Sequence, residues 1–338
     1  MYLQFLNCNK SPRLVPYWSL VLAFFLILGA GPSGAADVLR VNAFAGATNL
    51  ALFAGLAKGF FDKRELKVEL EFTPNSDLQR SGLAAGKFEI AIAGVDNAVA
   101  MVELAGRDVV IVTGGDAGMN EFLVQPEIKT LADMRGKTLL VDAPNTSFAL
   151  LGKKILLLNG LKTGDYALKP VGGTAIRVKS LLAKEGEAAI VNLPFSIDAK
   201  RQGVRSVGRA VDLIGPYQSS GAFVMRAWAK KNGPLLERDI AAYVESLRWA
   251  MRPENRAEAA GLLASRLKIG QDVALQTYDM LLEPGFGLQR DAKLDLAGFK
   301  TVLALRAEIE GQWGGKPPAP ERYLDLSYYE RAMKLVGR

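Results

Sequence analysis

Short apolar segments alternate with segments of helical spacing from residue 38 to residue 200, and few folds accommodate such an order. Phe88 to Ala93 is nearly all apolar, as strands buried on both faces are. Lys67 to Thr73 alternates polar and apolar side chains, which predicts a half-buried strand near a sheet edge. This βαβα order predicts an α/β fold in which parallel sheets carry helices on both faces.

The same pattern predicts bounds for the other elements. Strands are expected at 38–44, 109–113, 138–141, 167–171, 188–191 and 221–225. Helices are expected to begin near Thr48, Asp77, Asn97, Thr146 or Ser147, and Thr174. Beyond residue 225 we expect helices at 236–251, 253–267 and 271–282, a Pro/Gly linker at 311–320, and a short helix from Ser327.

A chain of 338 residues exceeds the size at which a single core stops growing, so two lobes are expected. Leu83 to Ile92 resembles Leu182 to Val191, and this weak repeat fits either two related lobes or chance similarity. The expected division is a signal peptide at 1–36, the first part of lobe 1 at 37–125, lobe 2 at 126–218, a return to lobe 1 with a helical C-terminal part at 219–310, and a linker and helix at 311–338.

The N-terminus has the pattern of a cleavable secretory signal. Lys10 and Arg13 precede an apolar run from Trp18 to Ala30, which is shorter than the about 20 residues of a membrane span. Cleavage is expected after Ala36, and an uncleaved anchor is the alternative. The one cysteine, Cys8, precedes the apolar run, so the mature protein is expected to be periplasmic, without a disulfide or a lipid anchor.

Missing residue types exclude much chemistry. The chain has no histidine, and signal cleavage would remove its cysteine, so the usual ligands of zinc, copper and haem are absent. Catalysis by a Ser-His-Asp or Cys-His arrangement is excluded for the same reason. Catalysis by carboxylates alone stays possible, but no spacing of residues argues for it. We expect no metal, no cofactor and no enzymatic activity. Cleavage would leave 40 basic and 35 acidic residues, which is a net charge of +5. Because the basic residues are scattered along the chain, no nucleic-acid partner is expected.

Polar and small residues follow the strands at the points where doubly wound sheets bind ligands. Helix N-termini at these points offer unpaired N–H donors. We therefore expect a small organic molecule to bind in a cleft between the lobes. The predicted ligand-binding residues are Thr48, Asn49, Asn75, Ser76, Asp96, Asn97, Asp142, Asn145, Thr146, Ser147, Phe148, Thr174, Asn192 and Phe195.

These positions also have structural interpretations. Threonines at helix starts are ordinary caps, and an aromatic residue such as Phe148 or Phe195 can belong to the core instead of a pocket wall. Asp96 and Asp142 can cap helices or pair with an amine or a protonated ring nitrogen. Arg177, if it points inward, suits a carboxylate or a sulfonate. The charge of the ligand therefore stays open at this point.

Three stretches resemble the sulfonate/nitrate/taurine-type periplasmic binding proteins of ABC transporters, a superfamily that also includes thiamine-pyrimidine-precursor receptors and synthases. The first holds LALFAGLAKGFF at 50–61, LKVELEF at 66–72 and LAAGKFEIAIAG at 83–94. The second runs from 128 to 161, and the third is AAIVNLPFSIDAKRQG at 188–203. The likeness covers about Val38 to Leu282, most of the mature chain.

The resemblance implies a periplasmic binding protein fold of type II, in which a hinge joins two doubly wound lobes, and delivery of the ligand to an ABC permease of the inner membrane. It supports ligand contacts at Thr48, Asn49, Asn75, Ser76, Asp96, Asn97, Asn145 to Phe148 and Asn192. Many relatives carry a neutral residue at Asp96, which puts inherited sulfonate specificity in doubt.

Two alternatives to a transport receptor stay open. The pyrimidine-synthase branch uses histidine and a cysteine-rich motif, and both are absent here, which argues against that enzyme. An extracytoplasmic sensor or scaffold with the same fold is the other alternative. In either case we expect a monomer.

Overall fold

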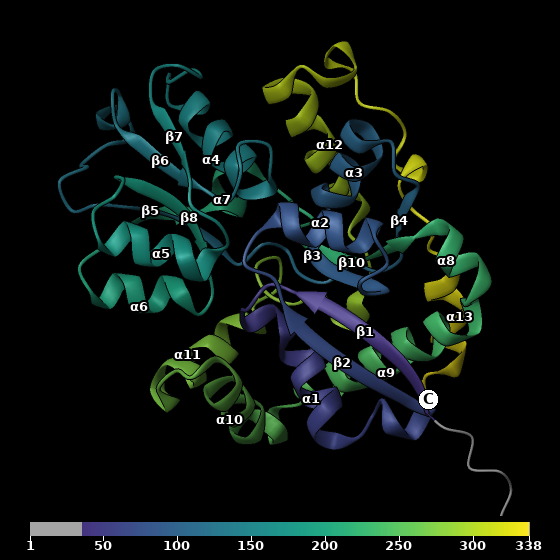
Figure 1. The fold of residues 1–338 in the computed structure, drawn as a ribbon. Helices are drawn as coiled ribbons and strands as arrows, with labels where there is room; N and C mark the ends of the chain where they lie inside the picture. The colour runs from purple at the N-terminus through teal and green to yellow at the C-terminus, as the bar shows by residue number, and fades with distance from the viewer. Residues whose placement is uncertain (1–35, 338) are drawn as a thin grey trace, which may run out of the picture. The chain divides into compact units, whose positions relative to one another are not determined.

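The computed structural model describes residues 36–337, so Cys8 and all of the predicted signal peptide except Ala36 lie outside the described residues (Figure 1). Within this range the chain forms two five-stranded sheets. The first has the strand order β2 (Leu66–Phe72), β1 (Asp37–Ala43), β3 (Ile90–Gly94), β10 (Ser220–Met225) and β4 (Val109–Ile111). The second has the order β7 (Ala167–Pro170), β6 (Thr138–Val141), β8 (Ala188–Asn192), β5 (Asn120–Val124) and β9 (Arg205–Arg209).

Helices connect the strands and then cover both sheets. The first lobe uses α1 (Leu50–Lys58), α2 (Ser76–Ala84) and α3 (Asp96–Ala105). The second uses α4 (Ser147–Leu158), α5 (Thr174–Leu182), α6 (Phe195–Arg201) and α7 (Ala210–Ile214). The C-terminal part adds α8 (Arg226–Lys231), α9 (Gly233–Ala250), α10 (Arg256–Leu267), α11 (Gln271–Leu281), α12 (Leu296–Glu310) and α13 (Ser327–Leu335). The predicted α/β fold with two doubly wound lobes is confirmed.

The prediction of parallel sheets was wrong for the strands next to the crossings between the lobes. β10 runs antiparallel to both β3 and β4, and β5 runs antiparallel to both β8 and β9. β5 carries the chain into the second sheet and β10 returns it to the first, so each enters its sheet against the direction of its neighbours. An apolar run does not encode its direction, and β5 and β9 were not expected at all.

The first helix packs as its spacing predicts, although it starts later than expected. Thr48 was expected to cap this helix, but it lies in a short 3₁₀ turn (Ala47–Asn49) and makes no capping bond with its side chain. Leu52 and Phe53 of α1 are buried in one core with Ile240 of α9. Burying a side chain of this size contributes about 1.5–3 kcal/mol, which holds α1 and α9 against one face of the first sheet.

Helix α12 lies in the part of the chain that was predicted to be helical, although its bounds were not predicted, and it joins the two lobes. Its Phe299 and Val302 share a buried core with Leu151 and Ile155 of α4, and Figure 1 shows the two helices in adjacent parts of the molecule. At the end of α12, Glu310 accepts a hydrogen bond from Lys153 Nζ at 2.7 Å. The C-terminal helices therefore brace both lobes.

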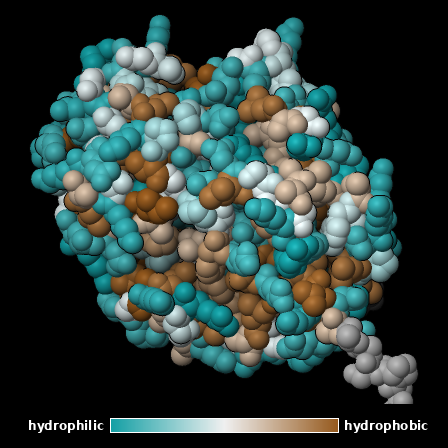
Figure 2. All heavy atoms as spheres, viewed as in Figure 1, coloured by the Kyte–Doolittle hydropathy of each residue, from teal (hydrophilic) through white to brown (hydrophobic). Residues whose placement is uncertain are grey.

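The surface is mostly hydrophilic on the face shown in Figure 2, where apolar residues form separate patches. Among the described residues, no helix combines the length and the apolar character needed to cross a bilayer. The apolar run that was interpreted as a signal lies outside these residues.

Candidate functional site

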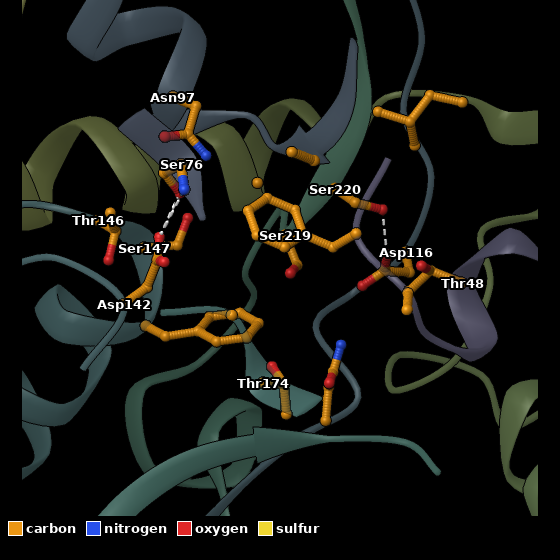
Figure 3. A pocket seen from close by; sticks show the side chains of 18 of the residues that line it. Thr48, Ser76, Asn97, Asp116, Asp142, Thr146, Ser147, Thr174, Ser219 and Ser220 are labelled. Atoms are coloured by element: carbon orange, nitrogen blue, oxygen red, sulfur yellow. Dashed lines mark hydrogen bonds between the residues drawn. The ribbon is translucent and has the colours of Figure 1, made fainter. Parts of the chain in front are cut away.

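A hollow of about 660 Å³, part of it open to solvent, lies where strands of both sheets end (Figure 3). The first lobe contributes the end of β3, the loop after β1 and the starts of α2 and α3, and the second contributes the loop after β6 and the starts of α4 and α5. The lining residues are Phe44, Ala45, Thr48, Ser76, Ile92, Ala93, Gly94, Asn97, Asp116, Asp142, Thr146, Ser147, Phe148, Gly173, Thr174, Arg177, Asn192, Ser219 and Ser220.

The predicted residues largely converge on this hollow, since nine of the fourteen line it. These nine are Thr48, Ser76, Asn97, Asp142, Thr146, Ser147, Phe148, Thr174 and Asn192. They come from six loops that are far apart in the sequence, which is what the rule for doubly wound sheets requires.

Three of the other predicted residues hold the loops that shape the hollow. Asn49 is buried and its Nδ2 donates to the carbonyl of Phe44 at 2.7 Å, which fixes the loop after β1. The side chain of Asn75 caps α2 by accepting a hydrogen bond from the Leu78 N–H at 2.9 Å. Phe195 packs against the core beneath α5 and α6. The structure therefore gives these side chains local roles outside the lining.

Asp96 and Asn145 also lie outside the lining, because they bind Arg306. The guanidinium Nη2 of Arg306 donates to Asp96 Oδ2 at 3.0 Å and to the Asn145 carbonyl at 3.0 Å. Asp96 also accepts a hydrogen bond from the Ser147 hydroxyl. Burial raises the pKa of Asp96, while Arg306 and Ser147 favour its ionised form and oppose that rise. Asp96 therefore joins the lobes to α12, and no carboxylate oxygen is presented to a ligand from this position.

Arg177 points inward, although the sequence left its direction open. Its side chain is 1 % exposed and lies over the Phe148 ring, with 5.2 Å between Cζ and the ring centroid. Nε and Nη2 donate to the Ile190 carbonyl at 3.2 and 2.9 Å, and Nη2 also donates to Thr174 Oγ1 at 3.0 Å. Burial lowers its pKa to about 10, and the charge of Asp142 opposes this change. Arg177 remains cationic at neutral pH.

Asp142 connects the lobes across the hollow. Its Oδ2 accepts hydrogen bonds from the backbone N–H of Ser76, at 3.3 Å, and from the hydroxyl of the same residue. Its Oδ1 is buried and accepts no hydrogen bond from the described residues. Figure 3 shows this pair on one side of the hollow.

Two backbone hydrogen bonds make the same connection between the lobes. The Ala47 N–H donates to the Leu193 carbonyl at 3.3 Å, and the Gly173 N–H donates to the Pro74 carbonyl at 2.9 Å. A Cβ at Gly173 would lie 3.2 Å from that carbonyl oxygen and 2.9 Å from the Phe44 ring, so the close approach requires glycine. These contacts describe a closed arrangement of the two lobes.

The sequence missed the residues that the crossing segments contribute. Asp116 is 1 % exposed, and it accepts hydrogen bonds from the Gly118 N–H at 2.8 Å and from the Ser220 hydroxyl. Burial raises its pKa to about 6, and these hydrogen bonds limit the rise. Asp116 ends a Gly-Gly-Asp loop after a strand, which is the same signal that located the other loops. Ser219 and Ser220 come from the returning segment and carried no such signal.

The described residues show no cluster suited to a metal ion, since no three Asp, Glu, His or Cys side chains gather at one point in residues 36–337. The hollow instead combines hydroxyls, amides, two carboxylates, one guanidinium and two aromatic rings. Such a mixture can hold and orient a small organic molecule through hydrogen bonds while apolar walls exclude water.

A family model described as NMT1/THI5 like matches residues 48–257. Comparison with curated protein sequences found no match. Solved structures share the fold, including a protein from Bordetella bronchiseptica RB50 with a TM-score of 0.77 and 18% identity, covering 88% of this chain and 98% of that one.

Two further matches are binding proteins by name. The periplasmic nitrate-binding protein NrtA from Synechocystis PCC 6803 has a TM-score of 0.73 and 13% identity, and the match covers 89% of each chain. The periplasmic aliphatic sulphonate binding protein SsuA from Escherichia coli has a TM-score of 0.67 and 20% identity, covering 87% of this chain and 99% of that one. The same fold also occurs in the desulfurization enzyme DSZB, with a TM-score of 0.61 and 15% identity over 88% of this chain and 99% of that one.

Proposed function

Because the chain belongs to the NMT1/THI5-like family, we propose that it is a periplasmic solute-binding protein that delivers a small organic molecule to an ABC permease of the inner membrane. The observation that carries this proposal is the hollow between the lobes, where loops from both sheets present polar side chains to one shared space. Two proteins of the same fold are named as periplasmic binding proteins, which supports the same role.

Binding is proposed to work by closure of the lobes over the ligand. Ser76 and Asp142 bind each other from different lobes, and so do Asp96 and Ser147. These contacts between the lobes would seal a ligand in the hollow from solvent. A few charge-assisted hydrogen bonds together with desolvation typically give affinities between micromolar and nanomolar, about −8 to −12 kcal/mol. We propose that the protein acts as a monomer.

The first test is a thermal-shift screen of the purified protein with amines, alcohols, carboxylates, sulfonates and pyrimidines, together with native mass spectrometry of molecules that co-purify with it. A ligand is expected to raise the melting temperature and to be recovered unchanged. Phe148→Ala, which removes one wall of the hollow, is expected to reduce the shift. Phe72→Ala is the matched control, because Phe72 is 44 % exposed on β2 and does not line the hollow.

Two results would contradict the proposal. If no compound shifts the melting temperature and nothing co-purifies, the hollow is not a binding site. If a compound binds and is chemically converted, the protein is an enzyme, as the desulfurization enzyme of the same fold is. Uptake of the identified ligand by cells, with and without the protein, then separates a transport receptor from a sensor.

A further inference from the structure

The charged groups of the hollow do not balance. Among the described residues that line it, Asp116, Asp142 and Arg177 carry charge, so the lining holds two carboxylates and one guanidinium. Figure 3 shows the two carboxylates on opposite sides of the hollow. Unless one carboxylate takes up a proton, the site has an excess of one negative charge.

Arg177 has little capacity left for an anionic ligand. An arginine has five N–H groups. Arg177 donates from Nε and twice from Nη2, to the Ile190 carbonyl and to Thr174 Oγ1, and from Nη1 to the Gly172 carbonyl at 2.8 Å. Four of the five N–H groups are therefore used by the protein, and the charge of Asp142 acts on the same guanidinium. A sulfonate or a carboxylate would find neither a free fork of donors nor an unopposed positive charge.

The carboxylates, in contrast, have capacity left for donors on a ligand. Asp142 Oδ1 is buried and accepts no hydrogen bond from the described residues. Asp116 is bonded to neutral donors, Gly118 and Ser220, and it takes part in no ion pair with a Lys or Arg among residues 36–337. A buried carboxylate without a cation is costly, and a cation supplied by the ligand would offset that cost.

The uncharged part of the lining fits the same kind of ligand. Asn97 is 3 % exposed, and its Oδ1 accepts no hydrogen bond from the described residues, so an amide oxygen is available to an N–H donor. Phe44 and Phe148 add aromatic walls, whose faces attract cations. Donor-poor carboxylates, an amide and aromatic faces are the partners that an organic ammonium or amidinium group requires.

Resting on the proposed function, we propose that this hollow binds a small organic cation, an ammonium or amidinium group on a compact apolar body, with the charged end at Asp116 and a further N–H donor at Asp142. The site would reject sulfonates and other anions of the same size, because both carboxylates would repel them.

The test compares two sets of probes that differ only in their polar end. The first set is benzylammonium, benzyl alcohol and phenylmethanesulfonate, and the second is butylammonium, butanol and butanesulfonate. Calorimetric titration of the purified protein at neutral pH and low salt is expected to show that, in at least one set, the ammonium compound binds about tenfold or more tighter than the sulfonate.

Matched variants then assign the preference to a residue. Asp116→Asn is expected to weaken ammonium binding about tenfold or more and to leave binding of the alcohol within about twofold. Asp77→Asn is the control, because Asp77 is 75 % exposed in side-chain area and does not line the hollow. Circular dichroism of both variants establishes that they are folded.

The outcomes separate the ligand class from the proposed function. Tighter binding of a sulfonate, or an Asp116→Asn variant that binds the ammonium compounds as well as the parent protein, would overturn the proposed ligand class and leave the receptor function standing. If none of the six probes binds and no molecule co-purifies, both proposals are overturned.

Discussion

Arg306 provides the sharpest test of how the two lobes are held together. Its side chain is fully buried on α12, where Nη2 donates to the carbonyl of Asp96 at 3.1 Å, to Asp96 Oδ2 at 3.0 Å and to the Asn145 carbonyl at 3.0 Å. The Arg306→Met substitution keeps much of the apolar stem and removes the charge. Asp96, which is also fully buried, would then lose the cation that favours its ionised form.

The expected loss follows from this burial. Removing one partner of a buried ion pair costs about 3–5 kcal/mol, because the remaining charge is left desolvated. For a total stability of about 5–15 kcal/mol, such a loss is large. The double variant Asp96→Asn with Arg306→Met carries no unpaired charge, so we expect it to be less destabilised than Arg306→Met alone.

Urea-induced unfolding of the parent protein and the variants at neutral pH measures these free energies. Arg331→Met is the control, because Arg331 is 44 % exposed and its ion pair with Glu237 at 2.6 Å lies at the surface, where such pairs contribute about 0–1 kcal/mol. A loss below about 1 kcal/mol for Arg306→Met, or a double variant that loses the sum of the two single losses, would refute the reasoning.

Two further predictions concern buried groups near the site. Asp239→Asn is expected to stabilise the protein by about 2–4 kcal/mol above about pH 7 and hardly at all near pH 4. The reason is that burial raises the pKa of Asp239 from 3.8 to about 7. The parent protein therefore loses stability as the pH rises through that range, and the variant does not. Urea unfolding at several pH values measures this difference, and a difference that does not depend on pH would contradict it. Gly94→Ala is expected to weaken ligand binding, because a Cβ there would lie 2.5 Å from Ser147 Oγ across the closed lobes. Gly261→Ala is the control, because its Cβ would meet nothing within 4 Å. Calorimetric titration is expected to give this variant the same affinity for the ligand as the parent protein.

The sequence by itself determined most of the elements, although not β5 and β9, and the loops that line the hollow. Apolar runs and helix starts are local, so they located β6 (Thr138–Val141) at its observed bounds and the start of α5 at Thr174. Because the carboxyl ends of parallel strands meet at one edge of a sheet, the same local pattern was enough to bring nine of the fourteen predicted residues to one hollow.

Only the tertiary structure decided which side chains line the hollow and which hold the protein together. Asp96 and Asp142 look alike in the sequence, as carboxylates just after strands. Arg306, which lies 210 residues after Asp96, takes the first for a buried ion pair, and no comparable partner reaches Asp142 Oδ1 among the described residues. Asp116 enters the site because the chain crosses between the lobes at that point. Electrostatic pairing depends on distance in space, so no local pattern of residues could have distinguished these three carboxylates.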